Sequence, residues 1–295
     1  MLFREALPLW WKEYRLNLQD TTIQKKKYDF HAHLLPAFGD FPLESITRQH
    51  IQDYIIQKAS SLTPGTVKCH YKILHPFFVW AHENGLIPSN PAQNIKLPKA
   101  HKKEIEVYSP EEMKALIRAA RPGWFADMIL LAYHTGMRRG ELHALKWNDI
   151  DFIRKSCIVR RSASTIQRGD FILHQPKTAE SVRTILLDKT CIEMLKARQA
   201  ASQTEWIFST RNQKPVSPSY DAHLLHAACE KAEIPYRNFH CIRHSTATYL
   251  LSQGINPKIV QEILGHSDLS ITLSTYGHVL PTMQREAVAA LDKLK

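Results

Sequence analysis

The chain has 295 residues, of which 44% are hydrophobic, and its 39 Lys and Arg outweigh 28 Asp and Glu to give a formal charge of +11. This length and apolar content exclude a disordered chain and predict two domains, each with its own core. The longest apolar run, Met128 to Tyr133, is far shorter than the roughly 20 residues that cross a bilayer, and the amino terminus lacks the layout of a signal peptide. We therefore expect a soluble cytoplasmic protein.

The cysteines and the distribution of charge narrow the class further. The five cysteines are widely spaced and never arranged as C-x-x-C, so we expect reduced packing residues rather than disulfides or a zinc site. Both the stretch 1–106 and the remainder of the chain are net positive. A polyanionic partner such as nucleic acid would use this charge, although solubility alone also accounts for it.

Residues 1–97 predict a small bundle of helices. Apolar residues recur at helical intervals from Phe3 to Leu18. Thr21 is the expected cap of a second helix, which carries a basic run of three lysines to about Leu35 and is stopped by Pro36 with Gly39.

Two further helices complete this predicted bundle. Thr47 is the expected cap of the third, and the fourth covers about Gly65 to Asn84, ending at Gly85. The polar, aperiodic stretch 98–106 that follows is typical of an interdomain linker.

A second domain is predicted over 107–295. Ser109 to Glu112 has the pattern of a helix cap with a first-turn proline, and helix signals continue to Trp147. Three β-type runs then predict a small antiparallel sheet; they cover Phe152 to Arg160, Phe171 to His174 and Val182 to Leu187. Helix signals return after Asp188, with Asn256 as a cap and Gly254 and Gly265 as stops. The expected fold class is mainly α with a small antiparallel β-sheet.

Four short segments of this domain hold residues suited to chemistry on a phosphate ester. Arg138 and Arg139 follow Gly136 at a helix start, which favours an anion site, although a solvated pair of arginines has the same pattern. Lys177 lies in a predicted turn. His240 and Arg243 share one face of a helix, with His244 one turn from His240.

Two later residues complete the set. His266 follows Gly265, where a histidine often serves only as part of a helix end. Tyr276 lies ten residues further on, where a core position is the ordinary interpretation of a single tyrosine. Each segment is weak when taken singly, and their joint order carries the information.

In that order, the segments resemble the tyrosine recombinase family, also called phage integrases. The resemblance covers 107–295, and the preceding bundle is similar to that family's helical core-binding domain. It implies one acidic supporting residue, Glu141. The catalytic residues that it implies are Arg138, Lys177, His240, Arg243, His266 and the nucleophile Tyr276.

The chemistry of DNA strand cleavage explains these residue types. Two guanidiniums neutralise the charge that builds up on the non-bridging phosphate oxygens, so no metal cofactor is expected. His240 is the expected base for the tyrosine phenol, and Lys177 the expected acid for the leaving 5′-oxygen. His266 would bind the scissile phosphate. The resulting 3′-phosphotyrosine conserves the energy of the broken bond, so rejoining needs no ATP.

The resemblance also implies partners. These are double-stranded core or attachment sites on DNA, a homotetramer in which the apolar face of a tail helix over 280–295 docks on a neighbouring protomer, and an accessory bending or directionality protein. Folding of the tail back onto its own domain is the alternative. The expected DNA contacts are basic residues of the bundle and linker, namely Lys25, Lys26, Lys27, Lys68, Lys99, Lys102 and Lys103.

Several functions remain open within this resemblance. The sequence from Gln175 to Thr184 favours an integrase of a prophage or mobile element, and an Xer-like resolvase is the near alternative. A type IB topoisomerase and a DNA-binding relative without catalysis are more distant ones. The core-binding bundle begins almost at Met1, without an arm-binding module, which fits a compact recombinase, a prophage integrase without arm sites or a truncated product.

Overall fold

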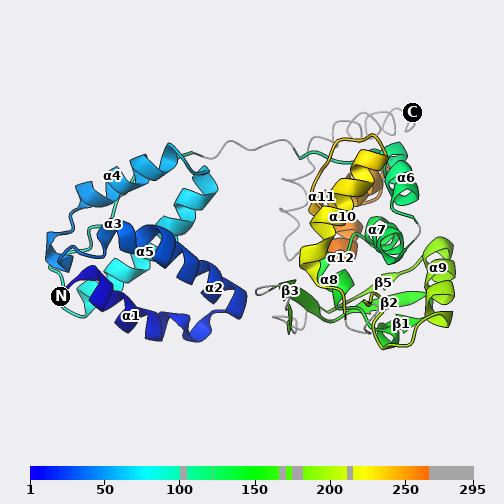
Figure 1. Ribbon diagram of the computed structural model, residues 1–295, viewed down its shortest axis with the longest axis horizontal. Coiled ribbons are helices and arrows are strands. Elements are labelled where there is room, and N and C mark those ends of the chain that lie inside the picture. Colours follow the sequence, from blue (N-terminus) through cyan, green and yellow to red (C-terminus); the bar gives the residue numbers. More distant parts are fainter. Residues whose placement is uncertain (100–104, 122, 166–170, 175–181, 211–214, 266–295) are drawn as a thin grey trace, which may run out of the picture. The chain divides into compact units, whose positions relative to one another are not determined.

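The computed structural model describes residues 1–99, 105–121, 123–165, 171–174, 182–210 and 215–265. The chain forms two compact units, Met1–Lys103 and Glu104–Lys295, which are described separately (Figure 1). Within the described ranges, no helix has both the length and the apolar character that crossing a membrane requires.

The first unit is entirely helical in its regular structure. A π-helical segment, Phe30–Leu34, joins two of the helices into one continuous right-handed path. The α-helices are α1 (Phe3–Tyr14), α2 (Asp20–Asp29), α3 (Leu35–Phe38), α4 (Arg48–Ala59) and α5 (Pro64–Glu83).

Two details of the predicted bundle were wrong. Thr21 does not cap α2, because the helix begins one residue earlier after Gln19. Pro36 does not stop the second helix, because it lies at the second position of α3, directly after the π-helical segment Phe30–Leu34. The helical path therefore continues to Phe38 and ends at Gly39.

The predicted start of the third helix and the predicted end of the fourth are confirmed. The Thr47 hydroxyl accepts a hydrogen bond from the His50 N–H at the start of α4, and α5 ends just before Gly85. The core is aromatic: Phe3 from α1 lies 4.7 Å, centroid to centroid, from Phe77 of α5. Burial of large aromatic rings, together with leucine and isoleucine side chains, forms the core of this bundle.

The predicted helix cap at Ser109, in the second unit, is confirmed. The Ser109 hydroxyl accepts from the Glu112 N–H, and the Glu112 carboxylate accepts from the Ser109 N–H, which closes a capping box. The α-helices that follow are α6 (Pro110–Ala119), α7 (Trp124–Thr135), α8 (Arg139–His143), α9 (Lys189–Ala200), α10 (Asp221–Lys231), α11 (His240–Ser252) and α12 (Pro257–Leu264).

The β structure differs from the single predicted sheet. A three-stranded antiparallel sheet has the order β1-β2-β5, and β3 pairs with β4 in a separate two-stranded sheet. The first predicted strand is broken, because Phe152 to Lys155 form a turn in which Lys155 has a positive φ of 50°. The strands are β1 (Ile150–Asp151), β2 (Ser156–Val159), β3 (Ser162–Thr165), β4 (Phe171–His174) and β5 (Arg183–Leu186).

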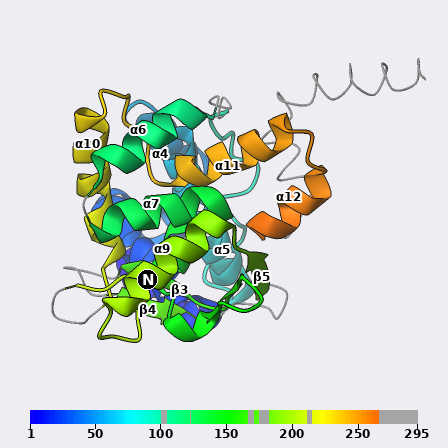
Figure 2. The same ribbon diagram turned by 90° about the vertical axis from the view of Figure 1, so that its right-hand side faces the viewer.

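Helix α7 is the centre of this unit, with α6, α9 and α11 packed around it (Figure 2). Met128, Ile129 and Leu131 of α7 are almost completely buried, as expected for a helix that is apolar on nearly every side. The expected class, mainly α with small antiparallel sheets, is confirmed. The turn that follows the carboxyl end of α7 leads to Arg138, the first of the predicted site residues.

Candidate active site

The turn after α7 brings the predicted segments together. Gly136 ends α7 in the left-handed region at φ 63°, and its N–H donates to the Ala132 carbonyl oxygen at 2.8 Å. A Cβ at this position would lie 2.5 Å from Cδ2 of Leu264, so both the backbone angle and the approach of α12 require glycine here. The chain reverses at Gly136 and enters α8 with Arg138 at the N-cap position.

Arg243 reaches the same turn from α11. Its side chain is buried, with 2% of the residue exposed, and Nη1 donates to the Gly136 carbonyl oxygen at 2.8 Å. One turn further along α11, the Thr246 hydroxyl donates to the Tyr133 carbonyl oxygen at 2.8 Å. Because α11 is fixed to the end of α7 at both points, Arg243 lies next to the turn that carries Arg138.

The guanidinium of Arg138 is fixed by hydrogen bonds and is still partly exposed to solvent. Its Nη1 donates to Glu141 Oε1 and its Nη2 to the Gly265 carbonyl oxygen, both at 2.8 Å, while 43% of the side chain stays exposed. The adjacent Arg139 is exposed. The sequence places two arginines side by side without distinguishing them. The structure shows that the guanidinium of Arg138 is hydrogen-bonded, whereas Arg139 is exposed.

Glu141 is the acidic centre of this cluster. Its buried carboxylate accepts from the Arg138 backbone N–H and side chain, and also from both Nη atoms of Arg183, at 3.0 and 2.7 Å. Burial alone would raise its pKa, but the hydrogen bonds and charge of Arg183 and the charge of Arg138 lower the pKa to about 2. Glu141 is therefore ionised throughout the neutral range.

His240 stands at the first position of α11, at the protein surface. Partial burial of the imidazole, together with the charges of Arg243 and Arg138, lowers the pKa of His240 below its ordinary value of 6.5. Its ring meets that of His244 edge-on with centroids 4.6 Å apart, and burial, His240 and Arg243 lower the pKa of His244 to about 4. His240 is therefore neutral at pH 7 and able to accept a proton.

The structure brings together four of the predicted site residues: Arg138, Glu141, His240 and Arg243. Lys177, His266 and Tyr276 lie outside the described residues. Sequence reasoning missed Arg183, which has no spacing signal of its own and shows its role only through its contact with Glu141.

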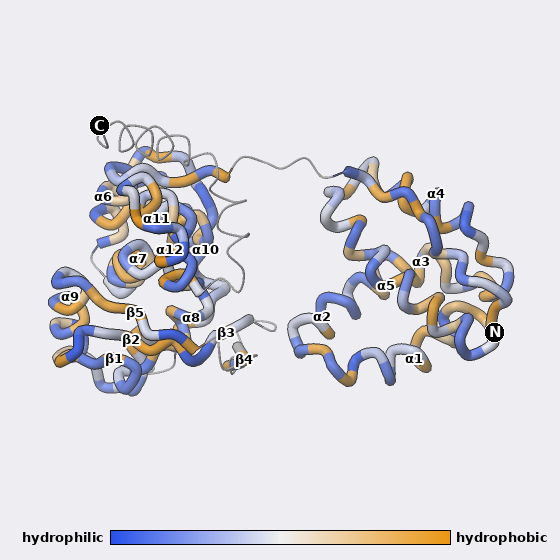
Figure 3. Tube along the Cα trace, turned by 180° about the vertical axis from the view of Figure 1, so that it is seen from behind, coloured by the Kyte–Doolittle hydropathy of each residue, from blue (hydrophilic) through white to orange (hydrophobic). Residues whose placement is uncertain are grey.

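The basic residues of the first unit are distributed over α2 and α5. Lys25 and Lys26 line a groove between these helices together with Lys72, which sequence reasoning missed although it lies one turn from Lys68. The remaining lining residues of this groove are Thr21, Thr22, Asp29, Cys69 and Ile73. Figure 3 shows hydrophilic colours along α2.

The other predicted DNA contacts are less clustered. Lys27 and Lys99 are exposed, and Lys68 is half-buried. Lys102 and Lys103 lie outside the described residues. Lys25, Lys26 and Lys72 are therefore gathered along one groove, whereas Lys27, Lys68 and Lys99 do not line it.

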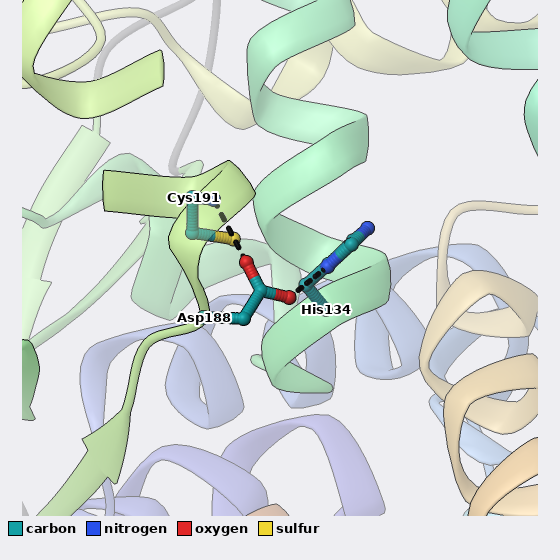
Figure 4. A group of neighbouring side chains, drawn as sticks. All are labelled: His134, Asp188 and Cys191. Atoms are coloured by element: carbon teal, nitrogen blue, oxygen red, sulfur yellow. Dashed lines mark hydrogen bonds and ion pairs between the residues drawn. The ribbon is translucent and has the colours of Figure 1, made fainter. Parts of the chain in front are cut away.

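A separate group has the composition of a metal site. His134, Asp188 and Cys191 each offer a ligand atom within 4.8 Å of the others, at the junction of α7 and α9 (Figure 4). Asp188 already caps α9 by accepting from the Cys191 N–H at 2.8 Å, and its other oxygen contacts His134 Nδ1.

The titration of this group favours a structural role. Burial raises the pKa of Cys191 far above its ordinary value, and a protonated thiol is a poor metal ligand. Burial also raises the pKa of Asp188, but the Cys191 N–H and His134 outweigh it and lower the pKa below 3.8. The cap that Asp188 forms on α9 and its pairing with His134 together account for the positions of these three side chains.

Comparison with known proteins gives the family. The model of the phage integrase family matches residues 106–283, and that of the N-terminal SAM-like domain of phage integrases matches residues 2–58. The chain belongs to the phage integrase family, the tyrosine recombinases.

Two relatives and one solved structure illustrate the similarity. A XerC-like tyrosine recombinase of Caldanaerobacter subterraneus subsp. tengcongensis is 32% identical over 85% of this chain and 71% of its own length. The ICEBs1 integrase of Bacillus subtilis is 27% identical over 92% of this chain and 77% of its own length. The Tn1549 transposon integrase bound to circular intermediate DNA superposes with a TM-score of 0.84 at 20% identity, covering 99% of this chain and all of that one. The chain is a site-specific DNA recombinase of the tyrosine type.

Proposed function

We propose that Arg138, His240 and Arg243 form the described part of the site at which this recombinase breaks and rejoins a DNA strand. The observation that carries this proposal is the meeting of two arginines from different helices at the Gly136 turn, beside a histidine that partial burial and their charge keep neutral. Fixed guanidiniums are suited to a pentacoordinate phosphate, because its negative charge grows on oxygens that they already face.

The remaining steps are assigned from the sequence order. Tyr276 attacks the phosphorus and forms a 3′-phosphotyrosine bond while the bond to the 5′-oxygen breaks. The phenol proton passes to His240, and Lys177 gives a proton to the leaving 5′-oxygen. His266 holds the scissile phosphate. Religation reverses these transfers with the 5′-hydroxyl of another strand, so the number of phosphodiester bonds is conserved.

DNA binding is divided between the two units in this proposal. We assign core-site binding to residues 1–97, the linker to 98–106 and catalysis to 107–295. In the first unit, Lys25, Lys26 and Lys72 neutralise backbone phosphates in the groove between α2 and α5, where the hydroxyls of Thr21 and Thr22 add donors.

Assembly follows from the reaction. Exchanging both strands between two duplexes requires four cleavage events, and a tetramer provides one site for each. We propose that residues 280–295 dock on a neighbouring protomer and that an accessory DNA-bending or directionality protein assists. Deleting 280–295 should abolish cooperative binding to paired sites while leaving cleavage of a single site intact; unchanged cooperativity would contradict this part.

Integration or excision of a mobile element is the proposed role, in keeping with the integrases among the similar proteins. The experiment uses a nicked suicide duplex that carries a site selected from a random-sequence pool by binding to the Tyr276→Phe variant. Incubation in EDTA should give a covalent adduct with the wild type and none with Tyr276→Phe. No adduct with the wild type would leave a DNA-binding protein, and an adduct that relaxes DNA without exchange would indicate a topoisomerase.

A further inference from the structure

Arg183, the first residue of β5, is held by three hydrogen bonds. Nη1 and Nη2 donate to the two oxygens of Glu141 at 3.0 and 2.7 Å, and Nε donates to the Ile263 carbonyl oxygen at 3.1 Å. Only 10% of the side chain is exposed. A bidentate pair of this kind fixes the plane of the carboxylate as well as its distance from the guanidinium.

The carboxylate that Arg183 fixes is the one that holds Arg138. Glu141 Oε1 accepts from Arg138 Nη1, and Oε2 accepts from the Arg138 backbone N–H, both at 2.8 Å. Arg138 and Arg183 thus both donate to the same two carboxylate oxygens. Removing Arg183 would leave a buried carboxylate with half of its partners and free to rotate.

Arg183 also supports the end of α12. Its Nε donates to the carbonyl oxygen of Ile263. Two residues later, the carbonyl oxygen of Gly265 accepts from Arg138 Nη2 at 2.8 Å. A Cβ on Gly265 would lie 2.8 Å from Cδ of Arg183, so the Arg183 side chain packs directly against this turn. The Arg138 guanidinium is oriented by Glu141 and by the Gly265 carbonyl oxygen. The Arg183 side chain contacts Glu141 and packs against the turn at Gly265, so both contacts depend on Arg183.

We propose that Arg183 is a positioning residue for strand cleavage, which sets the Arg138 guanidinium through Glu141 and through the α12 turn without touching DNA. This inference rests on the proposed role of Arg138. Catalysis by fixed charges depends on preorganisation, and a guanidinium that wanders by an ångström loses most of its effect. Residues behind the contact layer supply that order.

The chain provides a matched control in Arg198. Its Nε donates to the Ile207 carbonyl oxygen at 2.6 Å, its Nη1 donates to Asp127 at 3.0 Å, and 19% of its side chain is exposed. It therefore has the same kind of anchors as Arg183 but no contact with Glu141 or Arg138. Loss of Arg198 reports the effect of breaking a half-buried arginine pair in this unit.

The first measurement is the single-turnover rate of adduct formation on the selected duplex. Arg183→Met should lower this rate ~100-fold, a size typical of a catalytic group misplaced by about 1 Å, and Arg198→Met by less than ~3-fold. A second duplex carries a neutral methylphosphonate at the scissile position, which needs less charge neutralisation. On it, the loss caused by Arg183→Met should shrink below ~10-fold. Equal losses for Arg183→Met and Arg198→Met, or an undiminished loss on the neutral duplex, would overturn the proposal.

A second measurement does not depend on turnover. The ¹⁵N signals of the Arg138 guanidinium should shift and average in Arg183→Met and in the milder Arg183→Lys, because an ammonium cannot replace the fork. They should stay unchanged in Arg198→Met. Unchanged Arg138 signals in the Arg183 variants would overturn the positioning role. A wild type that forms no adduct would instead contradict the proposed catalytic function, while this measurement still decides whether Arg183 positions Arg138.

Discussion

Arg243 and Gly136 are joined by a 2.8 Å hydrogen bond from a buried guanidinium to the carbonyl oxygen of the turn that leads to Arg138. The bond connects two segments that are 107 residues apart in sequence. Because of this hydrogen bond, the backbone of the turn at Gly136 is part of the candidate site.

Gly136→Ala should damage both stability and cleavage. Its methyl group would meet Leu264 at 2.5 Å in a left-handed conformation, and we expect a loss of ~2–4 kcal/mol in the free energy of unfolding. The control is Gly254→Ala, which has a similar φ of 74° but open space around the added carbon. Urea unfolding and adduct formation should show a loss of ~1 kcal/mol and retained activity for the control. Equal behaviour of the two variants would show that the approach of α12 is unimportant.

Glu141→Gln should show a stability difference that depends on pH. An ionised Glu141 with a pKa near 2, against 4.5 ordinarily, stabilises the fold above pH 4.5, and this contribution is lost as the pH falls toward 2. At ~1.4 kcal/mol per pH unit, the full effect is on the order of 3 kcal/mol. Urea unfolding of both proteins from pH 6 to pH 2.5 should give a difference that shrinks on acidification. A constant difference would contradict the low pKa.

His240 should titrate below 6.5 in the folded protein. Burial and the charges of Arg243 and Arg138 disfavour the imidazolium, so the acid limb of the cleavage rate should also fall below this pH. Histidine NMR titration measures the midpoint directly. Arg138→Gln should raise it, because one positive charge is removed, whereas Arg139→Gln at the exposed neighbour should not. A midpoint that responds equally to both variants would argue against a specific cluster.

Lys72→Gln should weaken DNA binding by the first unit in a manner that depends on salt. If the groove lysine neutralises one phosphate, the slope of log affinity against log salt concentration should fall by about 1. Lys189→Gln is the control, since this lysine is 89% exposed on α9 of the other unit. Fluorescence anisotropy with the selected duplex from low to high salt gives both slopes. An unchanged slope for Lys72→Gln would remove the groove from the interface.

Asp188→Ala should destabilise the second unit by ~1 kcal/mol, because α9 loses its cap. Asp188→Ser restores a cap without the charge that faces His134, so it should recover most of the loss. Urea unfolding measures the three proteins. Added Zn²⁺ should leave the unfolding midpoint of the wild type unchanged, and a stabilisation by zinc that Asp188→Ser abolishes would show that the cluster of Figure 4 binds metal.

Local signals in the sequence were sufficient for most helix limits. Ser109, Thr47 and Asn256 cap the helices that they were expected to cap, and Gly85 and Gly265 follow the ends of theirs with positive φ, because capping and left-handed turns depend on a few adjacent residues. The first predicted strand, Phe152 to Arg160, failed over its first half, because residues 152–155 form the turn that lets β1 pair with β2. The choice of a partner strand is not local.

By itself, the sequence determined the class of the protein, since residue types in a fixed order restrict the chemistry whatever the fold. The tertiary structure decided how those residues cooperate. Nothing in the spacing of Arg183 distinguishes it from a solvated arginine, and Arg138 is held by the Gly265 carbonyl oxygen, 127 residues away, as well as by the neighbouring Glu141. Both depend on contacts between β5, α8 and α12, which are distant in sequence and meet only because the packed core brings their ends to one place.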